Sequence, residues 1–120
     1  MKKEDKAKFK LALTKAVIKL QEIVTEHLPE EGVAQPVSLT MPIVGTKNEA
    51  VFVFDNAAVP YIGKRTFIIG ARRKGSDKTF VYNALTGKDR SDILEYLRRE
   101  GLVDQLTERL AKLSDMAENN

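Results

Sequence analysis

The 120-residue sequence contains no cysteine and only one histidine, His27. The missing thiols exclude disulfides, thiolate catalysis and zinc or iron–sulfur sites built on cysteine. His27 has no second imidazole or thiolate with which to share a metal, and it comes at the end of an expected helix. We therefore predict no metal site and no cofactor. A chain without cysteine also suits a reducing compartment.

Long apolar runs are missing as well. Lys15 and Lys19 interrupt the apolar segment that follows the basic N-terminus, so no signal-peptide core forms. No stretch approaches the roughly 20 apolar residues that cross a bilayer. The sequence therefore predicts a soluble, cytoplasmic protein. Its length is that of one domain, which we expect to span residues 1–120 with 1–5 and 117–120 frayed.

Catalytic motifs are absent too. The sequence has no G-x-S-x-G element, and its serines have no distinctive setting. Glu49 and Asp55 flank an apolar segment, where an isolated acid is usually a turn residue. The Gly-Lys fragments at 45–47 and 86–89 lack the upstream glycine of a phosphate-binding loop. We therefore expect that the chain is not an enzyme.

Positive charge is present, and it is unevenly distributed. The net charge is +3, yet residues 61–90 alone hold eight Lys and Arg against two Asp, a net of +6. The excess falls on a predicted β-hairpin, in which the apolar runs 66–71 and 79–83 flank a polar segment containing Gly75. Within the first run, alternation puts Phe67, Ile69 and Ala71 on one face.

Two interpretations of this basic hairpin remain open. It is either a solvated surface or a binding surface for an anionic partner, which would be a nucleic acid or an acidic protein. The candidate binding residues lie at the turn and at the base of the hairpin: Lys64, Arg65, Arg72, Arg73, Lys74 and Lys78.

The rest of the pattern predicts an α+β fold. A long N-terminal helix over residues 6–28 has an apolar stripe, and three further residues widen its buried face: Leu11, Ile18 and Ile23. Short strands at 36–44 and 50–54 precede the hairpin, which makes an antiparallel meander of three or four strands. Two C-terminal helices follow, the first capped by Ser91.

Residues 57–63 are too apolar for an ordinary exposed loop, and Pro60 prevents a regular central strand. They form either a loop tucked over the core, an irregular edge strand, or a contact surface for a partner. The candidate interface residues are Val59, Pro60, Tyr61 and Ile62.

These patterns lead to one functional expectation and an alternative. Strands that are apolar on both faces, together with the 57–63 segment, predict a non-enzymatic protein-interaction or regulatory module that self-associates as a homodimer or binds a protein partner. The alternative is a nucleic-acid-binding module that uses the basic turn at 72–78.

Overall fold

The computed structural model describes residues 1–28, 36–56 and 65–118, and everything below concerns these residues. The chain forms helix α1 (Lys3–Glu26), four strands, and helices α2 (Arg90–Leu97) and α3 (Leu102–Glu118). The strands are β1 (Val37–Pro42), β2 (Asn48–Asn56), β3 (Arg65–Arg73) and β4 (Thr79–Thr86). The predicted α+β class is confirmed, with a single antiparallel sheet in the order β1-β2-β3-β4.

The central strands β2 and β3 bring large apolar side chains into register. Phe52 lies opposite Ile69, and Phe54 lies opposite Phe67. The rings of Phe54 and Phe67 stack with their centroids 4.4 Å apart and an angle of 9° between their planes. Such aromatic cross-strand pairs stabilise a sheet beyond the area that they bury.

The two faces of the sheet have different surroundings. Phe52, Phe54, Phe67 and Ile69 belong to one hydrophobic core with residues from all three helices, and we call their side of the sheet the helix-covered face. The alternating residues lie outside this core. We call their side, which no described helix covers, the open face; it includes Glu49, Val51, Val53, Ile68, Gly70, Arg72 and Val81.

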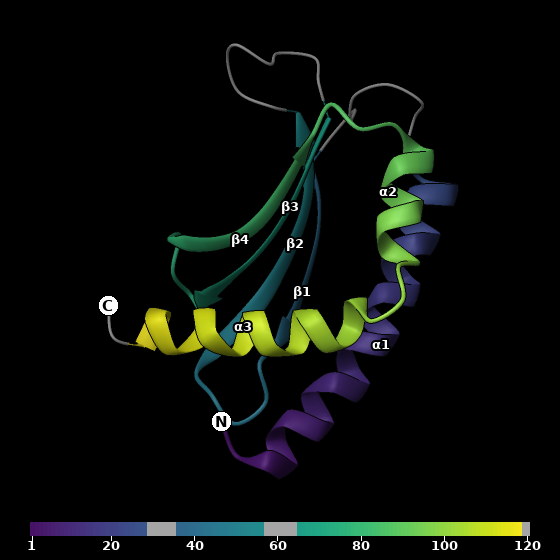
Figure 1. Cartoon of the computed structure of the whole chain (residues 1–120). Coiled ribbons are helices and arrows are strands. Elements are labelled where there is room, and N and C mark those ends of the chain that lie inside the picture. The colour runs from purple at the N-terminus through teal and green to yellow at the C-terminus, as the bar shows by residue number, and fades with distance from the viewer. Residues whose placement is uncertain (29–35, 57–64, 119–120) are drawn as a thin grey trace.

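The helices reach the covered face from two directions (Figure 1). Helix α3 crosses the strands and contacts β2, β3 and β4, while α1 and α2 lie beside each other and pack together. Ion pairs connect α1 to α3, between Lys6 and Glu108 and, at 2.5 Å, between Lys10 and Asp104. Among the described residues, no helix combines the length and the apolar character needed to cross a membrane.

The prediction of which residues widen the buried face of helix α1 is partly wrong. The expected apolar stripe is buried, and Ile23 joins it at 7% exposure, but Leu11 is 62% and Ile18 is 54% exposed. A helix turns by about 100° per residue, so positions 11 and 18 share a direction that points away from Phe9, Leu13 and Leu20. Leu11 and Ile18 therefore do not widen the buried face.

Two helix starts also differ from the sequence prediction. Helix α1 begins at Lys3, within the segment that we expected to be frayed, and Glu4 and Asp5 supply the negative charge that favours a first helical turn. Helix α2 is capped by Asp89, whose Oδ1 accepts a 2.8 Å hydrogen bond from the Asp92 amide, so the prediction of Ser91 as the cap is wrong. A charged carboxylate complements the helix dipole as well as the free N–H groups.

The hairpin turn agrees with the prediction. Strands β3 and β4 flank residues 74–78, and Gly75 has a φ of 85°, a conformation that glycine adopts without steric cost. Strand β4 continues to Thr86, three residues beyond the predicted end at Asn83. A register shift between Ile69 and Gly70 leaves Tyr82 as an extra residue on β4, which marks a β-bulge.

Candidate functional site

The six candidate basic residues do not form one cluster. Lys64 lies outside the described residues, as do the candidate interface residues Val59, Pro60, Tyr61 and Ile62. Arg65 is the first residue of β3 and Arg73 is its last, so the nine-residue strand separates them by about 26 Å at 3.3 Å per residue. A compact anionic ligand cannot contact both ends.

Arg72 and Arg73 are neighbours in sequence, but as successive strand residues they lie on opposite faces of the sheet. Arg72 lies directly across from Glu49 on the open face, and its Nε donates to Glu49 Oε1 over 2.7 Å. Both side chains are largely buried, at 32% and 16% exposure. The charge of Arg72 is therefore compensated within the sheet, and its side chain is a poor candidate for a free anion-binding group.

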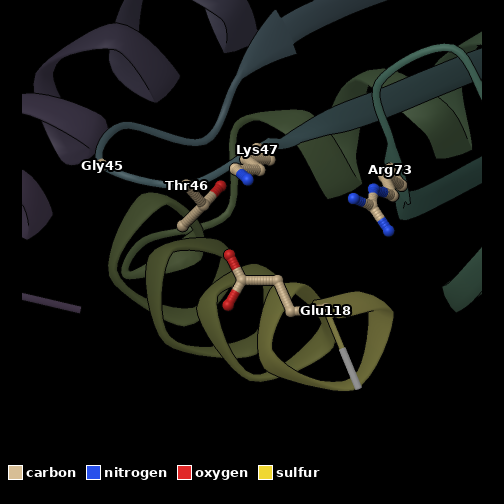
Figure 2. Close-up of a pocket in the computed structure, with 5 residues that line it drawn as sticks. All are labelled: Gly45, Thr46, Lys47, Arg73 and Glu118. Atoms are coloured by element: carbon tan, nitrogen blue, oxygen red, sulfur yellow. The ribbon is translucent and has the colours of Figure 1, made fainter. Parts of the chain in front are cut away.

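Arg73 instead faces a pocket at the end of the sheet. The pocket has a volume of about 510 Å³, and the described residues that line it are Gly45, Thr46, Lys47, Arg73 and Glu118. They come from the β1–β2 turn, the end of β3 and the end of α3 (Figure 2). Figure 2 shows the Glu118 carboxylate directed toward the β1–β2 turn at Thr46, with the Arg73 guanidinium apart from it on another side of the pocket.

Hydrogen bonds fix the turn that forms one wall of this pocket. Thr46 Oγ1 donates to the Ile43 carbonyl over 2.7 Å and accepts from the Asn48 amide over 3.1 Å. The Lys74 amide donates to the Lys47 carbonyl over 3.1 Å, which holds the β1–β2 turn beside the hairpin turn. The Thr46 hydroxyl is thus occupied by its own turn, and the lining groups left for a ligand are those of Lys47, Arg73 and Glu118.

A buried hydrogen bond holds α3 against this turn. Asn48 is 3% exposed, and its Nδ2 donates to the Ser114 carbonyl over 2.9 Å and to Ser114 Oγ over 2.7 Å. Ser114 and Glu118 are four residues apart, so they lie on the same side of α3. The Asn48–Ser114 contact therefore sets how Glu118 lies relative to Lys47.

The remaining basic residues of the turn are exposed. The Lys78 ammonium lies 5.1 Å from the centre of the Phe80 ring, a cation–π distance. Lys74 is exposed and does not line the pocket. The structure therefore brings together Arg73 and Lys74 from the predicted set, and it adds Lys47, which the sequence reasoning had assigned only to a turn.

A second hollow, of about 390 Å³, lies between α1 and α3 and is lined by Lys3, Lys6, Ala7, Lys10, Asp104, Thr107 and Glu108. Four of its six charged and polar lining residues already pair with each other, as Lys6 with Glu108 and Lys10 with Asp104. This surface is therefore occupied mainly by contacts that join the two helices.

Tyr96 is the one described titratable residue with a clearly shifted acidity. It is 6% exposed, and its hydroxyl has no hydrogen-bond partner among the described residues. Burial raises the pKa of Tyr96, and the Asn83 side chain, which approaches the phenol without reaching hydrogen-bond geometry, lowers it by a smaller amount. The Arg99 guanidinium lies 5.3 Å from its ring centre. Since Tyr96 lines neither of these pockets, we treat it as a core residue.

The histidine and the acidic residues offer no metal centre in the described part of the chain, where no group of three or more His, Asp or Glu is arranged to hold an ion. His27 follows the last residue of α1, and its Nε2 lies 3.9 Å from Glu26 Oε2 at the surface.

Comparisons with known proteins supply no relative: no protein-family model, curated protein or solved structure matches this chain.

Proposed function

We propose that the chain is a non-enzymatic protein-interaction module that self-associates. The observation that carries this proposal is the outer surface of α1, where Leu11 and Ile18 are 62% and 54% exposed. They lie about 10 Å apart along the helix and point the same way. Two large apolar side chains in line on the longest helix form a seam that a second helix can cover.

A second copy of α1 fits this seam because the seam can pair with itself. If two α1 helices run antiparallel, Leu11 of one copy stacks on Ile18 of the other, and the same contact repeats across the two-fold axis. In that register Lys8 lies near Glu22 of the second copy, so two attractive charge pairs flank the apolar contacts. Lys15 lies near its own counterpart at the axis, and Glu4 lies near Glu26 of the second copy, so the arrangement also contains unfavourable contacts.

Sedimentation velocity at micromolar concentration tests self-association directly. We expect the chain to sediment as a dimer and the Leu11→Lys, Ile18→Lys variant to sediment as a folded monomer. The matched control is Gln105→Lys, which adds a positive charge at an exposed position of α3 and should remain a dimer. A monomeric wild-type chain would refute the proposal.

Two single substitutions, which should change the stability of the dimer in opposite directions, then test the antiparallel register. Lys8→Glu should weaken the dimer because it places a like charge beside Glu22, whereas Lys15→Ala should strengthen it by removing repulsion at the axis. A dimer that is weakened by both substitutions would keep self-association and exclude this register.

A second candidate function is nucleic-acid binding, and one observation favours it. Lys47 joins Arg73 and Lys74 at one end of the sheet, where the two turns are hydrogen-bonded to each other. This set is narrower than the six residues expected from the sequence, since Arg72 is paired with Glu49. The three cations could contact consecutive phosphates of a single strand.

Electrophoretic mobility shifts with DNA and RNA at low and moderate salt test this candidate. Binding should weaken steeply with salt and disappear in the Lys47→Glu, Arg73→Glu variant. The control is Lys19→Glu with Arg109→Glu, which makes the same change in net charge at exposed positions of α1 and α3. The absence of any complex at low salt would exclude it and leave an acidic protein as the remaining anionic partner.

A further inference from the structure

The pocket at the end of the sheet has one positive wall. Lys47 and Arg73 both line it and both are exposed. Among the ion pairs formed within residues 1–28, 36–56 and 65–118, neither side chain takes part in one, in contrast to Arg72 next to them. Two cations without an ion pair among the described residues, one from the β1–β2 turn and one from the end of β3, thus border the same 510 Å³ space.

The opposite wall of the pocket is negative. Glu118 lines it, and Glu118 is the last residue of α3. The C-terminal end of a helix carries a partial negative charge from its unpaired carbonyl groups, and no basic residue lies in the last turn of α3 to offset it. A plain anion would therefore be attracted by Lys47 and Arg73 and repelled from the side of Glu118.

The separation of the two walls is held by the fold. The Asn48 side chain ties the strand residue after Lys47 to Ser114, one helical turn before Glu118. Asp5 packs so closely against Gly45 that a Cβ there would collide with its carboxylate, which adds a contact between α1 and the β1–β2 turn. The backbone segments that carry Lys47 and Glu118 are therefore held relative to each other by these contacts. Selective binding of a small ligand requires such a fixed arrangement.

From this arrangement we infer that the pocket binds a small zwitterion, with its phosphate or carboxylate group against Lys47 and Arg73 and its protonated amine against Glu118 and the end of α3. The inference concerns a surface separate from the α1 seam, so it does not depend on self-association. It also differs from nucleic-acid binding, because a polyanion gains nothing from Glu118.

Titrations followed by ¹⁵N–¹H NMR test the inference with three probes: O-phosphoethanolamine, inorganic phosphate and ethanolamine. We expect saturable shifts of the amides of residues 45–47, 73 and 118 with phosphoethanolamine, and weaker binding of the two fragments that carry only one charge. β-Alanine, which replaces the phosphate with a carboxylate, distinguishes the two kinds of anionic group.

The decisive variant is Glu118→Gln, because its effect should change sign with the probe. It should weaken phosphoethanolamine binding by roughly two- to fivefold, as for the loss of an exposed ion pair, and strengthen phosphate binding by a similar factor. Lys47→Ala with Arg73→Ala should weaken both probes by about tenfold. The control Lys74→Ala removes an adjacent cation that does not line the pocket and should change neither.

Three results would overturn the inference. One is the absence of saturable shifts at residues 45–47, 73 and 118. Another is a Glu118→Gln variant that binds both probes more tightly, which would indicate a simple anion site. The third is an equal loss in Lys74→Ala, which would indicate nonspecific attraction to the basic end of the sheet; all variants are compared at matched thermal stability.

Discussion

The helix-covered and open faces of the sheet are built from the same strands, yet they differ in almost every property. On the covered face Phe52, Phe54 and Phe67 are fully buried and Ile69 is 1% exposed. On the open face Val53 and Ile68 are half-buried and Val81 is 53% exposed. The open face also carries the Glu49–Arg72 ion pair, whereas the sheet residues of the core are apolar.

This difference separates what holds the fold together from what is available to partners. Burial of large apolar side chains is the dominant favourable term in folding, so the covered face should account for most of the stability of the sheet. Substitutions on the open face should lower the free energy of unfolding by less. Val51 and its strand partner Gly70 are an exception on the open face, since Val51 is only 2% exposed.

Truncation of one residue on each face should give the largest contrast. Phe67→Ala removes a fully buried ring that stacks on Phe54 and should lower the free energy of unfolding by about 3–5 kcal/mol. Ile68→Ala, one residue away on the open face, should lower it by about 1–2 kcal/mol because the side chain is already half-exposed. Urea denaturation of the two variants measures the difference. Equal losses would mean that the open face is covered in solution.

Gly70 lies on the open face, but substitution there should lower the free energy of unfolding. A Cβ at this position, next to the register shift between β3 and β4, would collide with the backbone carbonyl of Phe80 and lie 2.9 Å from Thr79 Cγ2. Gly70→Ala should therefore cost about 1–3 kcal/mol, measured by urea denaturation. Val51, which is paired with Gly70, is only 2% exposed, so the residues around Gly70 are tightly packed even though they lie on the open face.

A double variant identifies the cause of that cost. Thr79→Ser removes the Cγ2 atom but leaves the Phe80 carbonyl in place, so Gly70→Ala with Thr79→Ser should recover little stability. Full recovery would assign the cost to a movable side chain and contradict the backbone collision.

The contrast between the faces was partly predictable from the sequence. Alternation in 66–71 correctly assigned Phe67, Ile69 and Ala71 to one face, because the two-residue period of a strand is a local property. The same kind of reasoning failed for Leu11 and Ile18. Apolar character does not reveal whether a second layer covers that side of a helix, and here none of the described elements does.

The pocket could not be predicted from the sequence, because its lining residues come from distant parts of the chain. Lys47 and Glu118 are distant in the sequence, and they line one pocket because α3 packs across the strands and Asn48 bonds to Ser114. Gly45-Thr46-Lys47 correctly indicated a turn, but no sequence pattern shows which helix end will pack beside it. The pairing of Arg72 with Glu49 was likewise invisible until the strand register was known.

Adjacent arginines extend the comparison to charged residues. Arg72→Ala leaves the largely buried Glu49 carboxylate without its partner and should cost about 1 kcal/mol of unfolding free energy. Arg73→Ala removes an exposed side chain with no ion pair among the described residues and should change stability by less than about 0.5 kcal/mol. Chemical denaturation at low and high salt checks both values. A larger cost for Arg73 would mean that its guanidinium supports the fold as well as bordering the pocket.

The smallest effect belongs to the covered face and appears only at alkaline pH. Tyr96 is buried near Asn83 of β4, and burial raises the pKa of its phenol above the value of about 10 that it has in an unfolded chain. Above that pH the unfolded state loses the proton while the folded state retains it. The contribution of Tyr96 to stability is therefore complete below about pH 10 and declines as the pH rises toward the folded-state pKa.

Tyr96→Phe should remove this part of the alkaline decline. It should also be close to neutral at pH 7, because the hydroxyl that it deletes has no hydrogen-bond partner among the described residues. The measurement is the difference in unfolding free energy between variant and wild type at pH 7, 9 and 11. If the difference does not grow between pH 9 and 11, the Tyr96 phenol is solvated in solution, and this part of the covered face is more open than its side chains indicate.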